Sequence, residues 1–139
     1  MRSATATARD HSAVLTKAVR AAAERLGLRN RDLAGILGAS EASISRLSGD
    51  RTVRAGSREG ELAALFIRLF RSLDALVGGD DAKARAWFHA ENAHLGAVPA
   101  ARVRSIEGLV DVVVCPRLSG TGILSRSGLG FRLILRGGA

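Results

Sequence analysis

The sequence predicts an all-α protein: an N-terminal helix-turn-helix bundle joined by a long central helix to a small helical C-terminal domain. Hydrophobic residues make up 47% of the 139 residues but aromatic residues only 4%, so the core must be built from Leu, Val, Ile and Ala. That composition suits packed helices. Residues 59–77 carry apolar side chains at helical spacing, and residues 30–47 have the pattern of two short helices around Gly38.

The chain begins with a segment rich in Ala, Thr and Arg. We expect residues 1–11 to form a flexible arm, and a minor-groove DNA contact is the alternative to a disordered tail. Ser12 can cap a helix that ends at Gly27. Its inward-facing residues are expected to be Val14, Leu15, Ala18, Val19, Ala22 and Leu26. This helix would support the two that follow, because two short helices alone bury too little.

Residues 30–47 are typical of a helix-turn-helix. Asn30 can cap the first helix, Gly38 stands where a helix ends in a left-handed residue, and Ser40 can cap the second. The buried faces would then be Leu33, Ala34 and Leu37 in the first helix, and Ile44 and Leu47 in the second. A second helix presented in this way is built to lie in a DNA major groove.

Helix pairs around a glycine also occur in helical proteins that bind no DNA, but two features favour DNA here. The outward side chains of the second helix are short or polar, namely Glu41, Ala42, Ser43, Ser45 and Arg46. Residues 1–58 carry 11 Lys/Arg against five Asp/Glu, a net charge of +6. Arg51, Arg54 and Arg58 in the following loop could contact phosphates, the alternative being a solvated loop.

Residues 59–77 form the most strongly periodic segment of the chain. The apolar stripe consists of Leu62, Leu65, Phe66, Leu69, Phe70, Leu73 and Leu76. Each such residue stabilises by roughly 1.5–3 kcal/mol when buried. The stripe is wider than one partner helix needs, so we expect a central helix that joins both halves and offers a dimer surface. Gly78 and Gly79 end it.

The rest of the chain is less regular. Asp80 or Asp81 can cap a helix through about Ala90, residues 92–96 form a turn, and Pro99 suits the first turn of a helix to about Ser105. Residues 110–114 are β-branched in part and stay open between helix and strand. Residues 116–139 hold six glycines, four arginines and no acid, and we expect an irregular, disordered tail rather than a weak hairpin.

Charge and cysteine usage indicate the partners and the compartment. Residues 59–115 carry a net charge of −2, which points to a protein partner for this half. Cys115 is the only cysteine, so an internal disulfide is excluded and a reducing cytosol fits. Because the sequence has neither a signal-peptide pattern nor an 18-residue apolar run, we expect a cytoplasmic protein with no membrane partner.

No combination of residues indicates an enzyme, a metal site or a cofactor site. His89 and His94 are five apart with Glu91 between them, and on a helix they would point about 140° apart. A zinc helix needs two histidines four apart, so we interpret these as surface residues. Residues 120–122, Gly-Thr-Gly, lack the Lys and Ser/Thr of a phosphate loop. We expect no catalytic activity.

The order of several short motifs is similar to one family. The helix-turn-helix is followed by Ala55-Gly56-Ser57-Arg58-Glu59 and by a helix ending in Leu69-Phe70-Arg71-Ser72-Leu73-Asp74-Ala75-Leu76-Val77-Gly78-Gly79. Then come Ala86-Trp87-Phe88, Asn92-Ala93-His94-Leu95-Gly96, Pro99 and Glu107-Gly108-Leu109. Over roughly residues 12–114 this resembles the Xre/MbcA/ParS antitoxins, which join an Xre-like helix-turn-helix domain (here 12–58) to a toxin-binding domain (here 59–115).

The resemblance implies a type II toxin–antitoxin system. Such antitoxins bind a cognate toxin, commonly a RES-domain enzyme that degrades NAD, and block its active site. Often as a homodimer, they also repress their own operon at a palindromic double-stranded operator. The alternative is a stand-alone helix-turn-helix transcriptional regulator with a helical dimerisation domain.

The resemblance also implies roles for single residues. Glu41, Ala42 and Arg46 would meet base edges, whereas Asn30, Ser40 and Ser43 would meet phosphates. The pattern of the toxin-binding domain falls on Trp87, Asn92, Leu95, Gly96, Pro99 and Gly108. We interpret most of these as fold-defining, with Trp87 as the largest core residue of that domain.

The C-terminus departs from the family pattern. Such antitoxins continue from the valine run as a helix that ends in a short polar segment near the toxin's active site. Here Cys115-Pro116-Arg117 breaks the continuation, and the acid-free tail has the look of an out-of-frame translation. We therefore expect DNA binding to be retained and toxin neutralisation to be impaired.

Overall fold

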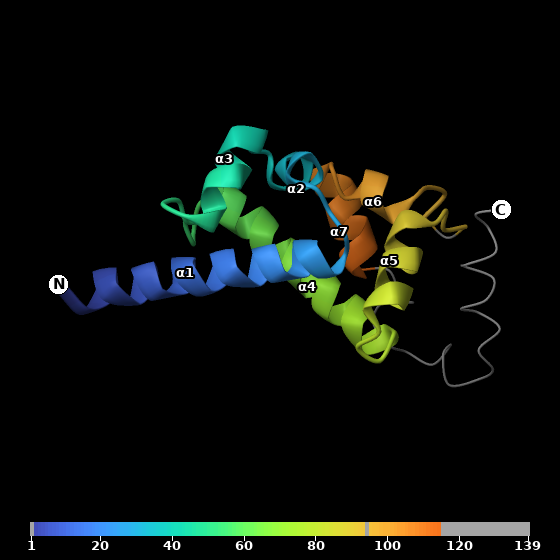
Figure 1. Cartoon of the computed structure of the whole chain (residues 1–139), viewed down its shortest axis with the longest axis horizontal. Coiled ribbons are helices and arrows are strands. Elements are labelled where there is room, and N and C mark those ends of the chain that lie inside the picture. Colours follow the sequence, from blue (N-terminus) through green and yellow to red (C-terminus); the bar gives the residue numbers. More distant parts are fainter. Residues whose placement is uncertain (1, 94, 115–139) are drawn as a thin grey trace. The chain divides into compact units, whose positions relative to one another are not determined.

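The computed structural model describes residues 2–93 and 95–114. Within these residues it contains seven α-helices, one short 3-10 helix and no strand, which confirms the all-α prediction. The helices are α1 (Arg2–Arg25), α2 (Asn30–Leu37), α3 (Glu41–Ser45), η1 (Arg46–Ser48), α4 (Arg58–Leu76), α5 (Asp81–His89), α6 (Pro99–Arg102) and α7 (Ile106–Val114) (Figure 1). The predictions for His94, for Cys115 and for the tail over residues 116–139 fall outside the described residues.

The chain divides into two compact units within α4, Met1–Ile67 and Arg68–Ala139. The first unit holds α1, α2, α3, η1 and the first half of α4. The second unit holds the rest of α4 and the three helices after it. The division lies later than the predicted boundary between residues 58 and 59, which coincides with the first turn of α4.

α1 begins at Arg2 rather than at Ser12, which corrects the expectation of a flexible arm for residues 2–11. Alanine recurs through this segment and has the highest helix propensity of any residue, so the helix extends toward the N-terminus. Ser12 therefore lies inside the helix and does not cap it. Its Oγ donates a hydrogen bond to the carbonyl oxygen of Ala8 at 2.9 Å.

The buried face of α1 differs in part from the predicted one. Val19, Ala22 and Leu26 are buried as predicted, but Val14 is 68% exposed, so its inward placement is wrong. Ser12, Thr16 and Ala23 are buried instead. The face turns toward these residues because the hydroxyls of Ser12 and Thr16 hydrogen-bond to the loop that follows η1.

The helix-turn-helix forms where the sequence predicts it. Gly38 ends α2 with φ +65°, and the Ser40 side chain caps α3 by accepting the Ser43 N–H at 3.1 Å. All five predicted apolar contacts of the pair are buried: Leu33, Ala34, Leu37, Ile44 and Leu47. Asn30 is not the cap of α2. That position belongs to Arg29, whose backbone N–H donates to the carboxylate of Asp32 at 3.1 Å.

α4 confirms the predicted central helix, and its apolar stripe is largely covered. Five of the seven stripe residues are buried, namely Leu62, Phe66, Leu69, Phe70 and Leu73, and the other two are half-buried. The stripe therefore leaves little apolar surface for a partner, and the dimer surface stays a prediction. Gly78 and Gly79, with φ of +65° and +80°, end the segment as expected.

The second unit packs around Trp87 and Phe88, which are fully buried together with Val103, Leu109 and Val112. Asp80 caps α5 by accepting the Lys83 N–H at 3.2 Å. Pro99 starts α6 as predicted. The helix ends at Arg102 and not at about Ser105, so it is shorter than predicted. Residues 110–114, left open between helix and strand, lie in α7.

Candidate nucleic-acid interface

α3 presents a polar face and is held by apolar contacts underneath. Ile44 and Leu47 are each 4% exposed and anchor α3 and η1 in the first unit. Glu41, Ala42, Ser45 and Arg46 are exposed. An accessible helix with short or polar side chains and one exposed guanidinium has the shape and chemistry that major-groove recognition requires.

The serines at the start of α3 stabilise the helix. Besides the cap hydrogen bond, Ser40 Oγ donates to Ser43 Oγ at 2.9 Å. Ser43 is half-buried, whereas Ser40 and Asn30 are exposed. The predicted phosphate contacts Ser40 and Ser43 therefore already hydrogen-bond to each other at the start of α3.

Arg51 is engaged inside the protein. Its Nη1 and Nη2 atoms meet the two carboxylate oxygens of Glu59 at 3.0 and 2.5 Å, and Nη1 also donates to the Ser43 carbonyl oxygen at 3.4 Å. Arg51 thus links the α3 backbone, through the Ser43 carbonyl oxygen, to the first turn of α4, through its bidentate pair with Glu59. The geometry makes Arg51 a positioning residue, in contrast to Arg54, whose side chain is exposed on the same loop.

Two hydroxyls of α1 hold the loop between η1 and α4. Thr16 Oγ1 accepts the Val53 N–H at 2.8 Å and donates to the Ser12 carbonyl oxygen at 2.7 Å. Ser12 Oγ accepts the Ala55 N–H at 3.0 Å. The sequence analysis missed this contact. The available signal was the pair of hydroxyls four residues apart in an otherwise apolar region of the helix.

Gly60 lets the same loop approach α4 closely. Ser57 Oγ accepts the Gly60 N–H at 3.1 Å and donates to the Arg54 carbonyl oxygen at 2.7 Å. A Cβ atom at Gly60 would overlap that carbonyl oxygen. Residues 57–60 and 105–108 share the pattern Ser-x-Glu-Gly, and Gly108 packs in the same way against the Arg102 carbonyl oxygen at the start of α7.

In the second unit, most of the predicted motif residues form the framework. Trp87, Asn92, Pro99 and Gly108 are buried, Leu95 is half-buried, and Gly96 is exposed with φ +62°. Asn92 holds its turn through the hydrogen bond from its N–H to the Ala97 carbonyl oxygen at 3.0 Å.

α7 carries two exposed apolar residues that sequence reasoning missed. Ile106 is 45% exposed and Val110 is 42% exposed. They are four residues apart, so they lie on one face of the helix. A long apolar run conceals this face in the sequence, because nothing local separates the buried Leu109 and Val112 from the exposed Val110.

Two family descriptions match the chain. Residues 6–68 match the antitoxin Xre-like helix-turn-helix domain, and residues 72–113 match the antitoxin Xre/MbcA/ParS C-terminal toxin-binding domain. The chain belongs to the Xre/MbcA/ParS antitoxin family. A search of curated proteins finds no significant match.

The antitoxin therefore has a toxin as its cognate partner through the second domain and a DNA-binding type of domain before it. Neither family is a family of enzymes. The first match starts at residue 6, inside the part of α1 for which the sequence predicts a flexible arm. None of the helices in the described residues is long and apolar enough to cross a membrane.

Proposed function

We propose that this antitoxin binds a RES-domain toxin that degrades NAD, and that it represses its own operon in the cytoplasm as a homodimer on a palindromic operator. The observation that carries the DNA-binding part is the exposed face of α3, with the Arg46 side chain exposed and Ile44 and Leu47 anchored below it. The toxin-binding part rests on the family match over residues 72–113.

Three side chains of α3 suit the reading of bases. Arg46 can donate two parallel hydrogen bonds to guanine O6 and N7, Glu41 can accept from cytosine N4, and Ala42 can meet a thymine methyl group. Arg54 and Asn30, both exposed, are the phosphate contacts that the geometry favours. Arg51 serves indirectly, because it is paired with Glu59 and donates a hydrogen bond to the Ser43 carbonyl oxygen of α3.

Ile106 and Val110 are the proposed contact point for the toxin. They belong to the matched toxin-binding domain, and they are large apolar side chains of α7 that are exposed. Removing such side chains from water stabilises a complex by roughly 25 cal/mol per Å² of buried apolar surface. A charge at this face would have to be desolvated on binding.

Co-purification with the product of the neighbouring gene tests the toxin assignment. A tagged antitoxin is expected to retain that product, and the Val110→Asp variant is expected to lose it while keeping DNA binding. Val14→Asp is the matched control, since Val14 is an exposed valine on α1. Retention by Val110→Asp would remove this face from the proposal, and co-purification of a protein that leaves cellular NAD intact would contradict the RES assignment.

A further inference from the structure

Two arginines lie on one flank of α1, near the helix-turn-helix. Arg9 and Arg20 are exposed, and neither side chain forms an ion pair or hydrogen bond with any of the described residues. They are eleven residues apart, which places them about 20° apart around the helix and about 16 Å apart along it. Lys17 lies about 60° from Arg20 and about 80° from Arg9 around the helix.

The loop after η1 contacts α1 between these two arginines. Thr16, which accepts the Val53 N–H, lies seven residues after Arg9 and four before Arg20, so it shares their flank. Ser12, which accepts the Ala55 N–H, lies one turn before Thr16. Arg54 stands between the two pinned amides with its side chain exposed. Arg54 therefore lies on the loop segment that is attached to α1 between Arg9 and Arg20.

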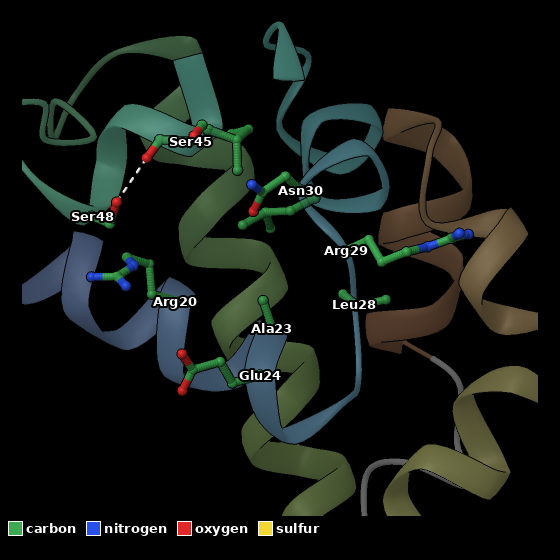
Figure 2. Close-up of a pocket in the computed structure, with 10 residues that line it drawn as sticks. Arg20, Ala23, Glu24, Leu28, Arg29, Asn30, Ser45 and Ser48 are labelled. Atoms are coloured by element: carbon green, nitrogen blue, oxygen red, sulfur yellow. Dashed lines mark hydrogen bonds between the residues drawn. The ribbon is translucent and has the colours of Figure 1, made fainter. Parts of the chain in front are cut away.

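This flank of α1 continues to the recognition helix. A depression of about 150 Å³ lies between α1, α2 and the α3–η1 segment, and Arg20 lines it together with Asn30, Ser45 and Ser48 (Figure 2). Ser45 is an exposed residue of α3, and Ser48 Oγ donates to its carbonyl oxygen at 2.8 Å. Glu24 adds one acid to the lining, whereas the Arg29 guanidinium points away from the depression (Figure 2) and pairs with Asp32 at 3.3 Å.

We propose that α1 is a second element that binds the DNA backbone, with Arg9, Arg54 and Arg20 contacting successive phosphates beside the bases that α3 reads. The inference rests on the proposed operator binding and extends it. Guanidinium groups bind phosphodiesters through paired, charge-assisted hydrogen bonds. A row of three over about 16 Å faces the regularly repeated charge of a duplex strand.

The salt dependence of binding by the full-length chain tests the proposal. Two duplexes of equal length are titrated between 50 and 200 mM salt, one carrying the DNA immediately upstream of the gene and one of random sequence. The double variant Arg9→Gln/Arg20→Gln is expected to reduce the slope of log K against log salt by about two for both duplexes, because each lost phosphate contact removes about 0.9. The ratio of the two affinities is expected to stay at the wild-type value.

The control is Arg68→Gln/Arg71→Gln, which removes the same charge from exposed positions of α4 in the second unit. If the control lost as much salt slope as the α1 variant, the loss would follow from the net charge of the protein alone. That result would overturn the assignment of phosphate contacts to α1. An unchanged slope in the α1 variant would overturn it too, as would an effect confined to co-purification of the toxin. If the wild-type protein does not prefer the upstream duplex, operator recognition fails, whereas a reduced slope on random DNA still supports the role of α1.

Discussion

At the scale of single residues, Ser12 and Thr16 show how a polar group can belong to a buried face. Both hydroxyls donate to a carbonyl oxygen of their own helix and accept a backbone N–H of the loop after η1. Each buried hydroxyl therefore has both a hydrogen-bond acceptor and a hydrogen-bond donor as partners in place of water. The same hydrogen bonds fix the loop that carries Arg54.

Replacing Thr16 by valine tests this contact. Valine fills the same volume but leaves the buried Val53 N–H without its acceptor, which costs about 1–3 kcal/mol. Urea unfolding should show this loss in the free energy of unfolding. Thr52→Val, at an exposed position of the same loop, is the matched control and should stay within about 0.5 kcal/mol of wild type. Equal stabilities for the two variants would contradict the role of Thr16.

Gly60 gives a second test at this scale. Gly60→Ala places a methyl group against the Arg54 carbonyl oxygen, so the loop or α4 must shift, and we expect a loss of about 1–3 kcal/mol. Gly35→Ala, at an exposed position within α2, should instead stabilise by about 0.5–1 kcal/mol through helix propensity. Thermal unfolding of both variants distinguishes the effects. A Gly60→Ala protein as stable as wild type would disprove the close approach.

At the scale of elements, α3 depends on its surroundings. With five residues, Glu41–Ser45, it is too short to be stable alone, because isolated helices below about 12–15 residues are marginal in water. It is fixed by the Ser40 cap, by Ile44 and Leu47 below, and by Arg51, which joins its backbone to Glu59 of α4. The recognition surface is thus a property of the whole first unit.

The two arginines of the loop are therefore expected to have separable roles. Arg51→Gln should lower the free energy of unfolding by about 1 kcal/mol, because it breaks a half-buried bidentate pair. Arg54→Gln should leave stability unchanged, weaken binding to all duplexes alike and reduce the salt slope by about one. Chemical denaturation and DNA titration of both variants check this. If the Arg51→Gln protein were as stable as wild type and had a reduced salt slope, Arg51 would have to be a phosphate contact.

At the scale of the whole molecule, the two halves differ in charge and in the kind of partner they suit. Residues 1–58 carry a net charge of +6, and residues 59–115 carry −2. The first set surrounds a polar helix, and the second includes a helix with two exposed apolar side chains. Residues 1–58 therefore suit a nucleic-acid partner, and residues 59–115 suit a protein partner.

Much of this architecture is predictable because it depends on neighbouring residues. The Gly38 turn, the Ser40 cap and the faces of α2, α3 and α4 follow from spacing and caps within a few positions. The features that were missed depend on distant residues. Thr16 and Val53 are 37 positions apart, and Ser12 and Ala55 are 43 positions apart, so local patterns favour Val14 as the inward residue. The same holds for Arg51, whose partner Glu59 belongs to the next helix.

The start of α1 was misjudged for a different reason. Serine is a favoured helix cap, which predicts a start at Ser12, but the alanines before it favour continuation of the helix. The local sequence does not show which of these two preferences is stronger. On α7, the exposed pair Ile106 and Val110 emerges only once Leu109 and Val112 are seen to be buried.

The most direct test of the account is the base preference of the Arg46→Ala variant. Binding of wild type and variant to the upstream duplex is compared at one salt concentration with binding to copies in which each base pair is changed in turn. We predict that Arg46→Ala weakens binding to the natural sequence by about 1–3 kcal/mol and becomes indifferent to the base pair at one position per half-site. A variant that keeps both wild-type affinity and wild-type preference would contradict recognition of DNA by α3.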